Sequence, residues 1–219
     1  MSAPDIRKDV ETAVKALARL QGRTLPIKAG NRALALTRKR FTDGGFDGKK
    51  WQEPYRRRLS FDGTEGRNRT LLSGNNHLRD STYAKAYPGK VYIRNQVEYG
   101  AMHNYGGSIT VTAKMKRYFW YRYIQIVGSK GNAVHKPVPS RLQFTRKGRL
   151  SRNRRNQSLS REAEFWRNMA LKRAGSMIRI PRRRFMGPDR NMEKEIRTVI
   201  DKELTNFIKK YGTYFTGSR

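Results

Sequence analysis

The sequence predicts a protein of mixed helices and strands, with helical segments near both ends of the chain and a hairpin between them. Apolar residues recur at helical spacing in residues 4–20 and again in residues 188–210, so each segment has one apolar face. Between them, two strand-like runs, residues 78–86 and 91–94, flank the turn sequence Tyr87-Pro88-Gly89-Lys90, which is typical of a β-hairpin. These observations predict helices combined with antiparallel strands.

The first half of the chain contains two predicted helices and a loop. Residues 4–20 carry acidic residues near their start, where the positive end of the helix dipole favours them, and Gly22 is expected to end this helix. Thr24 is expected to cap a second helix that runs to about Phe41. Residues 42–54 are rich in Gly and Asp and predict a loop.

The second half contains shorter elements whose type is harder to assign. Residues 99–105 predict a short helix, which two glycines close, and residues 109–113 alternate as a strand does. Residues 116–126 fit both the helical and the strand period, so both assignments stay open. Residues 161–173 could form a helix before the last amphipathic helix begins at about Pro188.

Charge is distributed very unevenly along the chain. The 219 residues include 49 Lys and Arg against 17 Asp and Glu, a formal charge of +32. The 63 residues from Tyr99 to Arg161 contain no Asp or Glu and fourteen Lys or Arg. Because a surface of one sign attracts polyanions, the sequence predicts nucleic acid or an acidic partner nearby. Low apolar content predicts that residues 128–175 are a basic, partly disordered arm or insertion in a single domain of residues 1–219.

The candidate contacts for such a polyanion are basic residues of the arm and of a later triple-arginine segment. They are Arg146, Lys147, Arg149, Arg152, Arg154, Arg155, Arg182, Arg183 and Arg184. Contacts of this kind are made to phosphates, so binding should be non-specific and steeply dependent on salt. Basic and aromatic residues interleave in residues 116–123. Such aromatic side chains can stack on bases, but the favoured interpretation is a core or subunit interface. The interface candidates are Tyr118, Phe119, Trp120 and Tyr121.

No motif of a catalytic or metal site is recognisable. The chain has no cysteine, and its three histidines lack Asp, Glu or Cys at ligand spacing. Asp43, Asp47 and Glu53 could bind a metal ion for nuclease chemistry, but the lysines and arginines beside them favour solvation or ion pairing. The prediction is a protein that is not an enzyme and has no cofactor or metal. A transmembrane stretch and a signal peptide are not predicted either, so the expected location is the cytoplasm, with no membrane partner.

Three segments, in this order, carry a family resemblance. The first is Arg40-Phe41 followed by residues 46–54, FDGKKWQEP; the second runs from Leu72-Ser73-Gly74 to the sequence YGAMHNYGG at residues 99–107; the third is IPRRRFMG at residues 180–187. Together they resemble the virion morphogenesis (tail completion) proteins of Mu-like tailed phages, which are similar to the head–tail connector, or neck, proteins of other long-tailed phages. The positions that match are Trp51, Gly74, Tyr99, His103, Gly106, Gly107, Pro181 and Phe185. An extra glycine, Gly100, and the long basic arm depart from the family pattern.

The resemblance implies an α+β fold, in which helices pack on an antiparallel sheet and the chain ends in a long amphipathic helix. It implies a structural virion protein that forms a homo-oligomeric ring, commonly of six subunits, at the head–tail junction after assembly in the host cytoplasm. Its neighbours would be the portal or connector, the tail tube or tail terminator proteins, and genomic DNA in the lumen. Two alternatives are a tail terminator and a non-specific nucleic-acid-binding protein. Trp51 would anchor its loop, His103 would pack beside the sheet, and Phe185 would pack at the start of the last helix.

Overall fold

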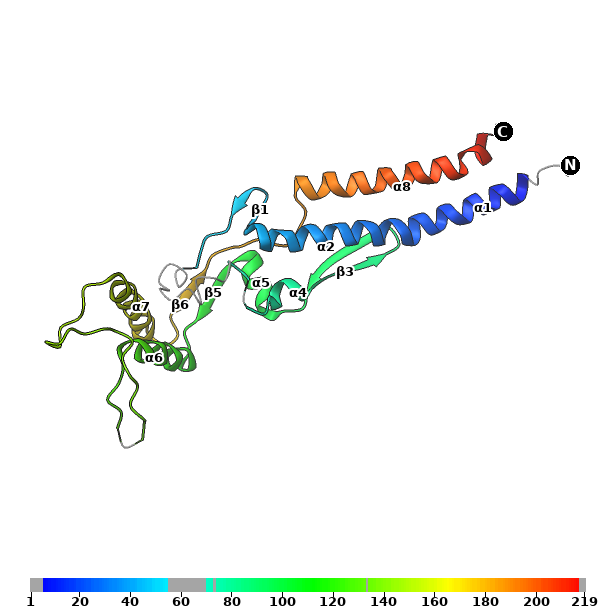
Figure 1. The fold of residues 1–219 in the computed structure, drawn as a ribbon. Coiled ribbons are helices and arrows are strands. Elements are labelled where there is room, and N and C mark those ends of the chain that lie inside the picture. Colours follow the sequence, from blue (N-terminus) through cyan, green and yellow to red (C-terminus); the bar gives the residue numbers. More distant parts are fainter. Residues whose placement is uncertain (1–5, 55–69, 73, 133, 217–219) are drawn as a thin grey trace. The chain divides into compact units, whose positions relative to one another are not determined.

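The computed structural model describes residues 6–54, 70–72, 74–132 and 134–216, with side chains from residue 7 to residue 212 (Figure 1). The chain divides into two compact units, which we describe separately. Unit 1 comprises Met1–Lys50, Asn75–Asn104 and Arg184–Arg219, and unit 2 comprises Trp51–Gly74 and Tyr105–Arg183. Helices and small antiparallel sheets occur together, which confirms the α+β class. The single domain stays a prediction.

Unit 1 is built around one long helical rod. Helix α1 (Ile6–Arg19), the π-helical turn η1 (Leu20–Thr24) and α2 (Leu25–Asp43) follow one another without a break (Figure 1). Helix α8 (Arg190–Thr216) runs antiparallel beside this rod. The ion pair between Arg32 and Glu195 and the ion pair between Lys28 and Glu203 join the two along their length. The last helix is therefore present as predicted, and it extends past the predicted end.

The predicted break between the first two helices is wrong. Gly22 lies inside η1, and Thr24 has helical backbone angles without a side-chain capping bond. A glycine costs only about 1 kcal/mol inside a helix, so packing on both sides can carry the helix through it. The wider π turn absorbs the irregularity and buries Leu20. The rod ends instead at Gly44, whose left-handed backbone (φ 67°) lets its N–H reach the carbonyl of Arg40.

The hairpin of unit 1 packs on the rod. Strands β3 (Thr82–Tyr87) and β4 (Lys90–Asn95) pair antiparallel with Tyr87 opposite Lys90, so the predicted hairpin is confirmed. It crosses α2 at Gly30, where an added Cβ would lie 3.1 Å from Cγ1 of Val91. The buried residues at the centre of this layer are Ala33, Leu36 and Met192, with Ile93 and Ile196 packed against them.

Three shorter elements complete unit 1. Strands β1 (Gly45–Phe46) and β2 (Lys49–Lys50) form a small hairpin inside the segment predicted as a loop. Helix α4 (His77–Asp80) precedes the β3–β4 hairpin, so the strand predicted from residue 78 begins instead at Thr82. Helix α5 (Glu98–Tyr105) follows it and confirms the short helix predicted there.

A bulky side chain at Gly30 should separate the hairpin from the rod. We expect Gly30→Leu to lower the free energy of unfolding by about 1–3 kcal/mol, because Val91 would have to move. Ala35→Leu is the matched control, since Ala35 is exposed on the same helix. Urea denaturation followed by circular dichroism measures both. Equal stability of the two variants would contradict the close approach.

The described part of unit 2 contains a strand pair and a helix pair. Strands β5 (Gly107–Thr110) and β6 (Met177–Ile180) are antiparallel. Helices α6 (Ala113–Val127) and α7 (Arg154–Leu171) pack on each other through buried residues. These residues are Phe119, Ile126, Leu159, Ala163, Trp166 and Ala170.

The helix pair settles the open assignment of residues 116–126 and corrects two predicted boundaries. The segment 116–126 is helical, and the strand predicted over 109–113 stops at Thr110 because Thr112 caps α6 by accepting the N–H of Met115. Helix α7 begins at Arg154, seven residues before the predicted start, so the second half of the predicted arm is largely helix. In the part of the chain that the structure describes, the strands form three separate pairs, and no helix has the length and apolarity to cross a membrane.

Candidate functional site

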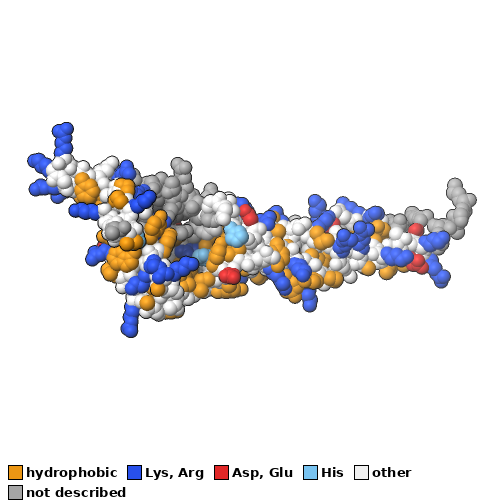
Figure 2. Space-filling model, turned by 90° about the horizontal axis from the view of Figure 1, so that it is seen from below, with side chains coloured by type: hydrophobic (Ala, Val, Ile, Leu, Met, Phe, Trp, Pro, Cys, Tyr) orange, Lys and Arg blue, Asp and Glu red, His pale blue; other side chains and the backbone are white. Residues whose placement is uncertain are grey.

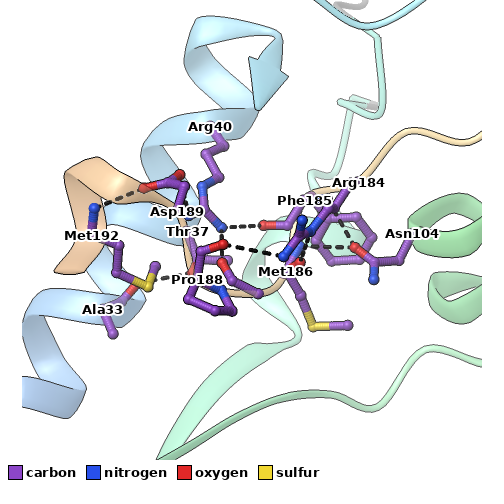
Figure 3. Close-up of polar contacts among 11 residues, drawn as sticks. Ala33, Thr37, Arg40, Asn104, Arg184, Phe185, Met186, Pro188, Asp189 and Met192 are labelled. Atoms are coloured by element: carbon purple, nitrogen blue, oxygen red, sulfur yellow. Dashed lines mark hydrogen bonds and ion pairs between the residues drawn. The ribbon is translucent and has the colours of Figure 1, made fainter. Parts of the chain in front are cut away.

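A buried arginine in unit 1 organises the segment that leads into α8 (Figure 3). Arg40 lies on α2 with 6% of its surface exposed. One of its nitrogens, Nη1, donates to the carbonyl oxygens of Phe185 (3.0 Å) and Gly187 (2.9 Å), and Nη2 pairs with Oδ2 of Asp189 at 2.5 Å. The other oxygen of Asp189 accepts the N–H of Met192 and caps α8. One guanidinium therefore fixes the turn before the last helix.

The same segment is held from α5. The side-chain oxygen Oδ1 of Asn104 accepts the backbone N–H groups of Phe185 and Met186, both at 2.9 Å. Asn104 is 2% exposed, and Phe185 is fully buried with its ring centroid 5.0 Å from that of Phe41. Buried polar groups must be satisfied, so these bonds determine where residues 184–189 can lie. We call Arg40, Asn104, Phe185 and Asp189 the polar node.

An aromatic ring of the β1–β2 hairpin joins this node. The guanidinium carbons of Arg40 and Arg184 each lie 4.3 Å from the ring centroid of Phe46. Stacking of this kind is worth about 0.5–2 kcal/mol per cation. Burial lowers the pKa of Arg40, and the Asp189 carboxylate acts in the opposite direction. Because an arginine stays charged at any physiological pH, Arg40 is a fixed cation that is paired with the Asp189 carboxylate.

Unit 2 has two extended loops between α6 and α7, and the second of them carries the predicted contacts Arg146, Lys147 and Arg149. An antiparallel bridge between Ser129 and Val138 closes the first loop, and one between Phe144 and Leu150 closes the second. In the second loop the N–H of Thr145 donates to the carbonyl of Arg149, so the chain reverses tightly. Gly148 has the left-handed backbone (φ 70°) that this reversal needs. The exposed side chains of Arg146 and Lys147 stand at the corner of the turn.

A buried asparagine fixes the base of the second loop. Asn156 lies in the first turn of α7 and is 1% exposed. Its Oδ1 accepts the N–H of Gln143 at 3.0 Å, and its Nδ2 donates to the carbonyls of Gln143 (2.8 Å) and Ser151 (2.7 Å). Asn153 caps α7 and donates to the side chain of Gln143. Both sides of the loop are thus bonded to the helix.

The charge of the two units differs. Unit 2 has 25 Lys and Arg against five Asp and Glu, whereas unit 1 has 24 against twelve. Between residues 105 and 183 the only acids in the sequence are Glu162 and Glu164. Glu162 pairs with Arg122 at 3.3 Å inside the helix pair. Blue Lys and Arg side chains stand out over the part of unit 2 visible in Figure 2, where orange apolar side chains lie between them. The excess charge therefore faces solvent.

The structure sorts the predicted polyanion contacts into two groups. The exposed ones are Arg146, Lys147, Arg149, Arg152, Arg154, Arg155 and Arg182. Two arginines instead serve the fold. Arg183 is 6% exposed and donates from Nε to the carbonyl of Gln52 at 2.8 Å. Arg184 stacks on Phe46 and donates to the carbonyls of Met186 and Pro188.

The predicted interface aromatics are also divided. Phe119 is buried in the helix pair and stacks on Trp166. Tyr118, Trp120 and Tyr121 are 49%, 36% and 56% exposed on α6. Three exposed aromatic side chains on one helix suit a contact with another protein, so the predicted subunit interface stays a prediction for these three.

The residues that carry the family resemblance are mostly in tight places. Trp51 is 8% exposed, and an added Cβ at Gly106 would lie 3.0 Å from the backbone nitrogen of Arg182. Tyr99 packs edge-on against His103, with ring centroids 5.8 Å apart. Gly107 begins β5, and Pro181 directly follows β6, the strand that pairs with β5. Gly74, by contrast, is exposed in a turn.

The acidic cluster considered for metal binding is not assembled as a site. Among the described residues, no group of three or more His, Asp or Glu side chains could hold a metal ion. Asp43 is exposed at the end of α2, and Asp47 is exposed in the turn of the β1–β2 hairpin. Lys50 donates from Nζ to the backbone carbonyl of Asp43 and not to its carboxylate, so the favoured interpretation of solvation or ion pairing stays a prediction.

Sequence reasoning missed the two asparagines that organise these sites. Asn156 stands three residues before Leu159 and ten before Trp166, on the apolar face of α7. A lone amide on an apolar helix face is a signal for a buried hydrogen-bonding role, because it could not be buried without partners. Asn104 gives no comparable signal, since α5 has no clear apolar face.

Comparisons with known proteins add nothing to this description: no family model, no curated protein and no solved structure matches the chain.

Proposed function

We propose that this chain is a structural protein of a tailed-phage virion. It forms a homo-oligomeric ring at the head–tail junction, where it completes the tail or joins it to the connector. The observation that supports this role most is the polar node. Three of its members, and the ring of Phe46 that stacks on it, come from the three segments that carry the family resemblance: Arg40 and Phe46 from the first, Asn104 from the second, and Phe185 from the third. Of the positions that match the family pattern, Phe185 is the one that belongs to the node, and it lies in the segment that leads into the last helix.

The proposed role is assembly and not catalysis. The charged groups of the node bind one another and backbone carbonyls, an arrangement that holds a segment in place. The exposed groups of unit 2 include many cations and several aromatic side chains, which suit contacts with macromolecules. Copies of the chain, the portal or connector, and the tail tube or tail terminator are the proposed partners.

The self-association of purified protein tests this role. We expect light scattering after size-exclusion chromatography to give a mass several times 25.5 kDa, and electron microscopy to show rings, commonly of six subunits. The double variant Tyr118→Glu, Tyr121→Glu should break the ring, because it places two charges on the exposed face of α6 that is the proposed subunit contact.

The matched control is Tyr92→Glu, an exposed tyrosine on the β3–β4 hairpin that should leave the ring intact. Circular dichroism of each variant confirms that it is folded. A protein that stays monomeric at every concentration, and in the virion, would overturn the proposal.

A further inference from the structure

We infer that residues 143–152 form a preformed contact for the phosphate backbone of duplex DNA, and that Asn156 is the residue that positions it. We call residues 143–152 the basic turn. The inference rests on the proposed function for the presence of DNA, since the genome passes the head–tail junction. It adds the surface that meets the DNA and the side chain that holds this surface in place.

The basic turn concentrates cations at a sharp reversal of the chain. Arg146, Lys147, Arg149 and Arg152 lie within seven residues and are all exposed. Arg154 and Arg155 follow in α7, and the first turn of this helix contains no acidic residue. The positive end of the helix dipole adds to their field. Long cationic side chains gathered in this way bind phosphates by exchange with the counterions around DNA.

The turn is held in shape before any partner arrives. Asn156 makes three hydrogen bonds to the backbone at its two ends, and the bond from Ser151 N–H to the Gln143 carbonyl closes its base at 2.9 Å. A loop that is already ordered loses less conformational entropy on binding than a free arm. The expected disordered arm is therefore, at this position, a braced loop that can bind several phosphates at once.

Phosphate suits this surface better than an acidic protein does. The fully buried cores of protein–protein interfaces are depleted in charged residues taken together, although arginine alone is enriched there. Protein–DNA interfaces are much more positive and more polar. The basic turn has cations at its corner and no acid within ten residues on its N-terminal side. The apolar side chains of Phe144 and Leu150 stand at its base and not at its tip.

The first experiment neutralises the turn in the full-length protein. The variant combines Arg146→Gln, Lys147→Gln and Arg149→Gln, and the control combines Lys194→Gln, Arg197→Gln and Lys202→Gln, which are exposed on α8. Both lose three charges. Binding to a fluorescein-labelled 30-base-pair duplex of mixed sequence is measured by anisotropy from 50 to 300 mM salt.

We expect the turn variant to bind at least about tenfold more weakly at 100 mM salt and to lose about 3 from the slope of log K against log salt. The control variant should keep both values near those of the wild type. Equal effects of the two variants would show that only total charge matters and would overturn the inference. So would binding of a polyglutamate chain of equal charge as tightly as the duplex.

The second experiment tests the positioning role of Asn156. Asn156→Ala leaves the net charge unchanged, so a purely structural role would lower thermal stability without changing the salt slope. We expect the slope to fall by about 1–2, because a loosened turn meets fewer phosphates at once. An unchanged slope in a folded variant contradicts the positioning role.

Hydrogen exchange of the wild type, without DNA, gives an independent answer if that variant does not fold. The amides of Gln143 and Ser151 should exchange slowly, since both donate in the braced turn. Fast exchange at both would contradict the preformed turn. Light scattering on the wild type separates this inference from the ring: a wild-type oligomer that does not bind the duplex sinks only the inference, and a wild-type monomer that binds it sinks only the proposed function.

Discussion

Replacing Arg40 with alanine should destabilise unit 1 by about 3–5 kcal/mol. The change leaves the Asp189 carboxylate without its cation and two carbonyl oxygens without their donor, in a place that water reaches poorly. Removing one partner of a buried ion pair is costly because the other charge stays buried. Urea denaturation followed by circular dichroism at 222 nm measures the loss through the helices.

Arg32→Ala is the matched control for this result. Arg32 also lies on α2 and also pairs with an acid of α8, Glu195, but both side chains are more than a third exposed. Exposed pairs contribute about 0–1 kcal/mol, so this variant should be nearly as stable as the wild type. Arg40→Lys should fall between the two, since a lysine keeps the charge but not the fork that reaches three acceptors. Similar losses of unfolding free energy for Arg40→Ala and Arg32→Ala would contradict a larger contribution of the node to stability.

Long periodic segments were the most predictable part of the fold. The face of α8 and the β3–β4 hairpin could be recognised because burial imposes a period that the residues repeat. The break at Gly22 could not be judged, because a local glycine penalty competes with packing that involves residues far along the chain. For the same reason, the helix or strand choice over residues 116–126 depended on α7, its packing partner.

The candidate site was predictable in charge but not in geometry. Counting charges identified the basic stretch, and six of its exposed residues were named from the sequence. Arg182, Arg183 and Arg184 are identical in type, yet only Arg182 is exposed. These three arginines differ in exposure because β6 ends at Ile180 and residues 184–189 then turn toward α2. The neighbouring residues in the sequence do not specify that turn. The hydrogen bonds of Asn156 could not be predicted from the sequence, because its partners are backbone groups, which every residue has.

The core of the helix pair in unit 2 depends on one aromatic side chain. Trp166 stacks on Phe119 with centroids 5.9 Å apart and donates from Nε1 to Oε1 of Glu162 at 3.2 Å. Arg122 lies over its ring at 4.9 Å and pairs with the same carboxylate. The ring thus fills the space between the helices and also helps to hold the charge pair that bridges them.

Trp166→Ala should therefore lower the stability of unit 2 by about 3–5 kcal/mol, the usual cost of the cavity left by a large aromatic side chain. Trp120→Ala is the control, because Trp120 is 36% exposed on α6 and should cost less than about 1 kcal/mol. All three tryptophans lie in unit 2, so fluorescence excited at 295 nm follows this unit alone, whereas circular dichroism follows both.

If Trp166→Ala shifts both signals to the same lower urea midpoint, the units unfold together, as the predicted single domain requires. If only fluorescence shifts, unit 2 unfolds alone and the single-domain prediction is wrong. An unchanged midpoint in fluorescence would contradict the place given to Trp166 in the core.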